Sequence, residues 1–239
     1  MGGVSEPLRT RTVAPNGRAF PARSHGPADF PETLIAHRTF GFTCFYFGDI
    51  AGAHDHFQKT IELYDQARHG DFASRFCQHP VDGAEIGDAL TLWVLGRIDE
   101  ALRLADRTLA DAESAGRAPT MGFVLSFAAR LGLIRYSSDA VATYSRALAD
   151  IVSRYDLPAF WAGSAVSFQG WARWSDGAEE STLADMLRGI AIDREQGRNG
   201  LWPSHEAALA QAEARAGETD AGLRRLDDAL AELEATESR

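Results

Sequence analysis

Apolar residues recur at helical spacing along most of the chain, but only after residue 30. From Pro31 onward they repeat every three or four residues, interrupted at intervals by Gly, Asp or Asn, and the strict alternation typical of strands is nearly absent. Residues 1–30 lack this pattern and are rich in Gly and Pro, so they bury too little apolar surface to offset the entropy of ordering. We predict a flexible N-terminal tail over 1–30 and one all-α domain over 31–239.

Five segments of this domain share one plan. Each is a helix, a tight turn at Gly or a polar residue, and a second helix with a small residue near its start and a larger apolar residue one turn later. The turns fall at Gly48, Gly96, Arg135, Gly177 and Gly217, and the first two are the furthest apart. The period is roughly 40 residues, longer than the period of about 34 residues in a tetratricopeptide repeat, so these units need longer helices or longer connections. Residues 68–83 have the composition of such a connection.

Small and large side chains at fixed distances from each turn predict how the helices pack. Two antiparallel helices approach closely only where a small side chain lies at their crossing, and a larger one then fills the groove a turn away. A single hairpin cannot bury its apolar stripe, so the units must stack. The sequence predicts a tetratricopeptide-like solenoid of about five hairpins, either a right-handed superhelix or a short curved stack. The predicted packing residues are Gly41, Ala53, Phe57, Ala89, Ala101, Ala140, Tyr144, Ala147, Gly170 and Ala229.

Several segments resemble the C-terminal tetratricopeptide-like region of large bacterial signalling proteins. They are AHRTFGFTCFYFGDIAGAHDHF (36–57), FCQHPVDGAEIGDALTLWVLGRIDEAL (76–102), GWARWSDG (170–177) with DMLRGIAI (185–192), and GLWPSHEAALAQAEARAGETDAGLRRLDDAL (200–230). In that family a class III adenylate or guanylate cyclase domain, or a winged-helix transcriptional activator, is joined to an AAA-type ATPase. The resemblance covers nearly the whole chain after residue 31, although His79 stands where the family commonly has an acidic residue. It implies a signalling or regulatory role beside such a domain.

The resemblance implies architecture and not a reaction. The chain has no cyclase domain and no G-x-x-x-x-G-K-[ST] phosphate-binding loop, and Lys59 is its only lysine. A hydrolytic nucleophile elbow is missing too, because no G-x-S-x-G occurs and Gly163-Ser164 lies within a helical pattern. Catalysis by Cys44 or Cys77 with a histidine has no supporting motif. We therefore expect no catalytic site and no cofactor.

Histidines gather in the first part of the domain, which raises the question of a metal site. His54, His56, His69 and His79 follow one another closely, and His37 is near them in sequence. A helical metal pair needs ligands three or four positions apart, whereas His54 and His56 are two apart and point to different faces. We expect no metal site.

Charge and composition narrow the possible partners. The net charge of −10 and the pI of about 5.2 describe a surface that repels phosphate backbones, so a general nucleic-acid role is disfavoured. Acidic residues concentrate in 206–239, where we predict a solvated helix face, the alternative being contact with a basic partner. No run approaches the roughly eighteen apolar residues of a membrane span, and no secretion signal is recognisable. We expect a cytoplasmic protein with reduced Cys44 and Cys77.

Aromatic residues cluster in the fourth unit, where Phe160, Trp161, Phe168, Trp171 and Trp174 recur at helical spacing. Core packing is the simpler interpretation. Alternatively, Trp161 and Trp174 line the concave groove and anchor a bound peptide or an adenine-like ring. Our functional hypothesis is a non-catalytic interaction module that captures a protein segment or docks onto a cyclase or ATPase domain in trans. The alternative is a regulatory domain that senses a small effector in the concave groove.

Overall fold

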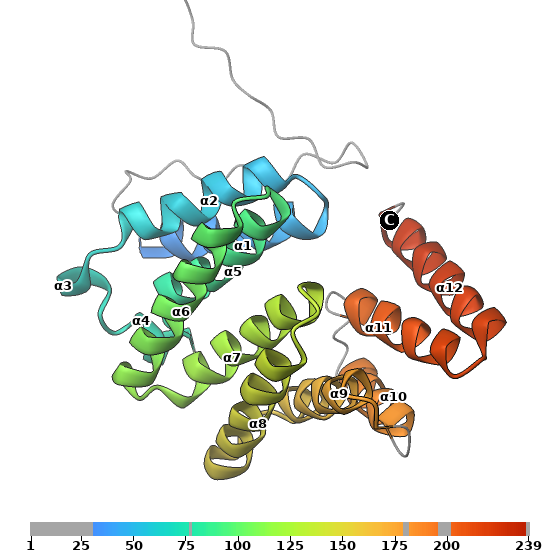
Figure 1. Ribbon diagram of the computed structural model, residues 1–239. Helices are drawn as coiled ribbons and strands as arrows, with labels where there is room; N and C mark the ends of the chain where they lie inside the picture. The colour runs from blue at the N-terminus through green and yellow to red at the C-terminus, as the bar shows by residue number, and fades with distance from the viewer. Residues whose placement is uncertain (1–30, 77, 179–181, 196–201, 238–239) are drawn as a thin grey trace, which may run out of the picture.

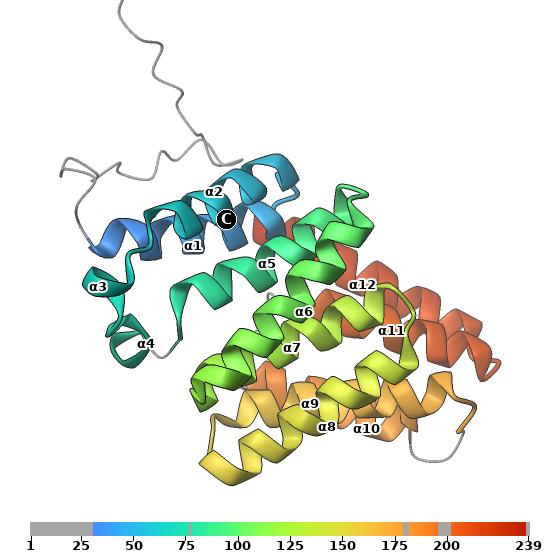
Figure 2. The ribbon, with the colours of Figure 1, turned by 60° about the vertical axis from the view of Figure 1, so that its left-hand side comes forward.

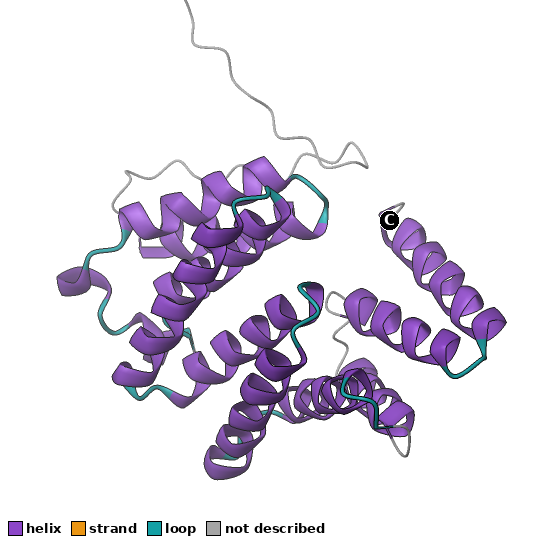
Figure 3. Ribbon diagram, viewed as in Figure 1, coloured by secondary structure: helices purple, strands orange, loops and turns teal. Residues whose placement is uncertain are grey.

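The structure, a computed structural model, describes residues 31–76, 78–178, 182–195 and 202–237. Over these residues the regular structure is helical and contains no strand (Figure 3), which confirms the all-α prediction. The predicted tail over 1–30 lies outside them. The helices are α1 (Pro31–Tyr46), α2 (Ile50–Leu63), α3 (Gln66–His69), α4 (Phe72–Arg75), α5 (Pro80–Val94), α6 (Ile98–Ala115), α7 (Ala118–Ile134), α8 (Ser138–Tyr155), α9 (Ala159–Ser175), α10 (Thr182–Glu195), α11 (Trp202–Arg215) and α12 (Thr219–Glu237).

The long helices pair into five hairpins, α1–α2, α5–α6, α7–α8, α9–α10 and α11–α12, as the repeat pattern predicts. The second helix of each hairpin packs against the first helix of the next, and the first helices also contact one another in order. The stack is curved (Figure 1), and the hairpin turns follow one edge of it (Figure 2). The short helices α3 and α4 occupy the connection between the first two hairpins, which explains why the first two turns are the furthest apart.

The same turn follows the first helix of every hairpin. A single residue in the turn adopts a left-handed backbone, and the amide that follows it donates to the carbonyl five positions back, as from Asp49 to Cys44 (2.9 Å) and from Glu218 to Glu213 (2.9 Å). This hydrogen bond closes the helix end in the manner of a Schellman motif. The left-handed residues are Gly48, Gly96, Tyr136, Gly177 and Gly217, with φ of 78°, 78°, 56°, 90° and 92°.

The third turn therefore lies one position later than the sequence suggested. Arg135 has a φ of −94°, and Tyr136 is the left-handed residue. Ala140, Tyr144 and Ala147 are half-buried, and Tyr144 and Ala147 pack against core clusters. The fully buried residues of α8 lie one position later: Val141, Ser145 and Leu148 are each 0% exposed. The error arose because this turn alone lacks the glycine that marks the other four. With the turn at Tyr136, the last three separations between turns become nearly equal.

The small and large positions meet as pairs at the helix crossings. A Cβ atom added at Gly41 would lie 2.6 Å from two ring carbons of Phe57, and one added at Gly170 would lie 2.9 Å from Cγ of Met186. These contacts leave no room for a side chain at either glycine. Ala89 occupies the same position before its turn as Gly41 and Gly170 and is buried. The other predicted packing alanines Ala53, Ala101 and Ala229 are buried too.

No helix in the part of the chain that the structure describes is long and apolar enough to cross a membrane.

Candidate functional site

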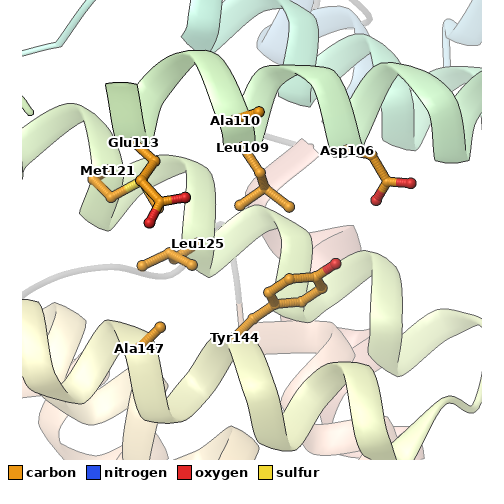
Figure 4. Close-up of a pocket in the computed structure, with 8 residues that line it drawn as sticks. All are labelled: Asp106, Leu109, Ala110, Glu113, Met121, Leu125, Tyr144 and Ala147. Carbon is orange, nitrogen blue, oxygen red and sulfur yellow. The ribbon is translucent and has the colours of Figure 1, made fainter. Parts of the chain in front are cut away.

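A groove lies between α6 and α8 (Figure 4). Its volume is about 380 Å³. Side chains of α6 and α8 form its two walls, and α7 supplies the floor between them. The lining residues are Asp106, Leu109, Ala110 and Glu113 from α6, Met121 and Leu125 from α7, and Tyr144 and Ala147 from α8. We call this surface the α6–α8 groove.

Helical spacing explains why these residues share one surface. The four α6 residues occupy positions i, i+3, i+4 and i+7, so they lie on one face of the helix. Leu109, Met121 and Leu125 make the interior of the groove apolar, and the side chain of Met121 is flexible. Asp106 and Glu113 place two carboxylates on the α6 wall, one on each side of Leu109 (Figure 4). The groove is thus apolar inside and acidic along one rim.

Tyr144 adds a hydroxyl to the opposite wall. Burial raises the pKa of this half-buried phenol, and the nearby charge of Asp106 raises it further. The phenol therefore remains protonated at neutral pH and is able to donate a hydrogen bond. The sequence had assigned Tyr144 to packing only, and no local signal marks it as a groove residue, because its exposure depends on the distance between α6 and α8.

The two tryptophans proposed from the sequence lie in different environments. Trp161 is 4% exposed and packs in a core cluster with Leu125, Leu148 and Ala165, so it is a core residue and does not line a groove. The physical reason is its position against Gly122, whose missing side chain leaves space for the indole ring. Trp174 is half-buried, and the guanidinium of Arg215 lies 4.5 Å from the centroid of its ring, a cation–π contact between α9 and α11.

The histidines have separate partners. His54 contacts Asp88 (2.7 Å), and His79 contacts both Asp82 (2.7 Å) and the hydroxyl of Tyr64 (2.9 Å). Across the described ranges, no group of three or more His, Cys, Asp or Glu side chains is arranged to hold a metal ion.

His37 and His56 form a pair that links α1 to α2, with 2.9 Å between their Nδ1 atoms. The pKa of His37 is lowered, first by burial and then by the charges of His56 and Lys59. Phe40 stacks on the His56 ring, with 5.6 Å between the ring centroids. These contacts give the histidine pair a structural role in the first hairpin.

Ser164, Asp193 and His205 meet where α9, α10 and α11 converge, and each is 1–2% exposed. The Ser164 hydroxyl donates to Oδ2 of Asp193 (3.2 Å), and the same oxygen lies 3.8 Å from Nδ1 of His205. A hydrolytic triad needs the histidine between the hydroxyl and the carboxylate. Here the carboxylate lies between them, so the contacts join three helices and do not activate the serine.

Arg130 on α7 is an unusual buried cation. The residue is 7% exposed, its Cζ lies 5.5 Å from the Phe127 ring centroid, and its Nε has no hydrogen-bond partner among the residues described. Burial lowers the pKa of this guanidinium, while Tyr46 and Asp193 act in the opposite direction. A buried guanidinium with an unsatisfied donor is an attractive partner for an anionic group.

Comparison with known proteins adds no relative: neither a protein-family model nor a curated protein sequence matches the chain.

Proposed function

We propose that this chain is a non-catalytic helical-repeat interaction module, and that the α6–α8 groove binds a short segment of a protein partner. The observation that carries the proposal is the combination of an apolar interior with an acidic rim in one groove of about 380 Å³. An apolar cleft with a few placed polar groups is typical of sites that accept a side chain or a short peptide.

The charges of the groove specify the chemistry of the segment. Asp106 and Glu113 are seven positions apart on α6, which corresponds to about 10 Å along the helix. We expect a segment whose apolar side chain enters between Leu109 and Tyr144, and whose Lys or Arg side chains lie about 10 Å apart to face the two carboxylates. The resemblance to signalling proteins suggests a cyclase or ATPase domain in trans as the source of the segment.

Selection of peptides from a randomised display library on the full chain tests this proposal. We expect enrichment of sequences that combine a large apolar residue with Lys or Arg on both sides. Ala110→Trp, at an exposed position in the groove wall, should fill the groove and abolish peptide binding. Ala184→Trp is the matched control, because Ala184 is exposed on α10 and lies outside the groove.

Circular dichroism should show the same helicity for both variants, since neither substitution replaces a buried side chain. Double reversal of the rim with Asp106→Lys and Glu113→Lys should change the selected sequences from basic to acidic flanks. Peptides that bind the Ala110→Trp variant as well as the unchanged chain would contradict the groove assignment.

Arg130 favours a second candidate function, the sensing of a small anionic effector on the inner helices. An effector that binds only the folded chain raises its melting temperature. A thermal-shift screen with nucleotides and carboxylates, repeated on Arg130→Met, tests this role. A shift that persists in the variant would rule out Arg130 as the anion-binding group, and the lack of any shift in the unchanged chain would speak against sensing of these compounds.

A further inference from the structure

The joints between neighbouring hairpins use the same positions each time. In the first helix of a hairpin, two positions one helical turn apart, at a fixed distance before the left-handed turn residue, face the preceding hairpin. Asp88 of α5, for example, accepts a hydrogen bond from Gln58 of α2 (2.8 Å). These positions are buried in α5 (Ala84 and Asp88), α7 (Val124 and Ala128) and α11 (His205 and Leu209).

The second helices use three positions, which also lie at fixed distances after the turn residue. In α10 they are Leu183, Met186 and Ile190, which pack in one cluster with Leu209 of the next hairpin. The corresponding residues of α2, α6 and α8 are also buried or half-buried. Burial of these three positions against the next hairpin is therefore a regular feature of the stack.

At the last hairpin the same three positions carry leucines that are exposed. Leu223, Leu226 and Leu230 of α12 are 56%, 37% and 59% exposed. These exposed leucines occupy the face that, in the earlier second helices, packs against the first helix of the next hairpin. Three leucines on one helix face are far more apolar than a solvated surface requires.

At the first hairpin the complementary positions are exposed. The equivalent residues before Gly48 are Ala36 and Phe40 of α1, and Phe40 is 45% exposed. A small residue and a large apolar residue one turn apart are the combination that lets a first helix approach a second helix closely. The two ends of the stack thus expose complementary surfaces, of the kind that pack together between successive hairpins.

We propose that copies of this chain associate head to tail, with α1 of one copy packing on α12 of the next in the way that successive hairpins pack inside the stack. Phe40 of one copy then lies against Leu223, Leu226 and Leu230 of its neighbour. This association does not depend on the α6–α8 groove. Because the two contacting surfaces differ, it generates a ring where the rotation closes and a filament where it does not.

The charges near the two ends agree with this contact and disfavour the symmetric alternative. Asp227 and Asp228 are exposed beside the leucines of α12, whereas α1 from Thr33 to Tyr46 contains no acidic residue. Pairing of two α12 helices about a two-fold axis would bring the acidic residues of both copies to one interface, which costs free energy. Contact between α12 and α1 avoids this repulsion.

Sedimentation velocity of the full chain, from micromolar to millimolar concentration, tests the proposal with three variants. The unchanged chain should gain average mass as its concentration rises. Phe40→Glu places a charge on the contact surface of α1, and Leu230→Glu places one on that of α12. Each variant should therefore remain monomeric when it is alone. Mixed in equal amounts, they should form a dimer of twice the monomer mass, because each supplies the end that the other lacks. Leu187→Glu, at a 45% exposed position on α10 away from both ends, should behave as the unchanged chain.

Three outcomes would overturn the proposal: an unchanged chain that stays monomeric at every concentration, an equal mixture of the two end variants that stays monomeric, or association that Leu230→Glu abolishes and Phe40→Glu leaves intact. The last result would indicate pairing of two α12 helices. Both replaced side chains are exposed, and circular dichroism verifies that the variants fold. Leu223→Glu replaces Leu230→Glu if the latter loses helicity.

Discussion

The first and fourth hairpins solve the same packing problem in different ways. In the first, the ring of Phe57 fills the space between helices, lying against Gly41 of α1 and Gly87 of α5. In the fourth, the backbones of α9 and α10 touch directly, so that a Cβ added at Gly189 would lie 2.5 Å from the carbonyl oxygen of Gly163 and 2.6 Å from the amide nitrogen of Ser167. The first hairpin relies on a large side chain, whereas the fourth adds direct main-chain contact to its Gly170–Met186 pair.

The difference should appear in how each joint tolerates change. The end of a phenyl ring shifts by rotation of its side chain, whereas a carbonyl group in a helix cannot move without displacing the helix. The first hairpin should therefore depend most on the large residue, and the fourth on the glycines. Four predictions test this contrast, beginning with the largest expected effect.

Phe57→Ala should be the most destabilising substitution, with a loss of about 4 kcal/mol in the free energy of unfolding. The ring is 0% exposed and contacts both helices that flank it, so its removal leaves a cavity that α1, α2 and α5 cannot all close. Urea unfolding followed by circular dichroism measures the loss. A loss below about 2 kcal/mol would mean that the surrounding helices collapse into the space.

Gly189→Ala should cost about 3 kcal/mol, because a single added methyl group meets two backbone atoms and forces α9 and α10 apart. Hydrogen exchange should show loss of protection in α9 and α10 and little change in α1 and α2, since each hairpin contacts only its neighbours. Protection that falls equally along the whole stack would instead indicate one cooperative unit.

Gly87→Ala should cost less, about 1–2 kcal/mol, although its Cβ would lie as near as 2.7 Å to a neighbour. The nearest atoms are the ring ends of Phe57 and Phe42, which are able to move. Phe57→Leu should partly rescue the variant by vacating that space, giving a favourable coupling in a double-mutant cycle. Additive losses would show that the ring is not what resists the methyl group.

Lowering the pH should destabilise the first hairpin, and we expect this to be the smallest of the four effects. Burial lowers the pKa of His37 in the folded chain, so below about pH 6.5 the unfolded chain binds a proton that the folded chain does not. The contribution of neutral His37 to the free energy of unfolding is thus complete above that pH, and it decreases as the pH falls towards the pKa of His37 in the folded chain. Unfolding at pH 7.5 and 5.5 should show this difference in the unchanged chain and a smaller one in His37→Gln. Equal pH dependence in both would remove His37 as its source.

The sequence located most turns because their signal is local. A glycine at a left-handed position marks four of the five turns, and the helical pattern on either side defines the hairpins. At the third turn Tyr136 takes the left-handed conformation without that marker, and the fully buried residues of α8 lie one position after the predicted ones. A tyrosine in the sequence does not indicate a positive φ, because the neighbouring helices impose this conformation on Tyr136.

The candidate surfaces were less accessible to prediction. Trp161 was proposed for a groove and is core, while Tyr144, predicted to pack, packs against the core clusters and also lines the α6–α8 groove. Both are aromatic residues on helices that pack against other helices, so each could lie on a covered or an open helix face. Whether such a face is covered depends on where the next helix crosses it, and that depends on residues distant in sequence, such as Gly122 beneath Trp161.

The sequence by itself determined the long helices, four turn residues and the small and large packing positions outside the third hairpin, because each follows from spacing along one or two adjacent helices. Only the tertiary structure decided which faces remain open: the groove between α6 and α8, the buried guanidinium of Arg130 and the leucines of α12. The spacing of apolar residues indicates which face of a helix favours burial. The positions of the neighbouring hairpins decide whether it is buried.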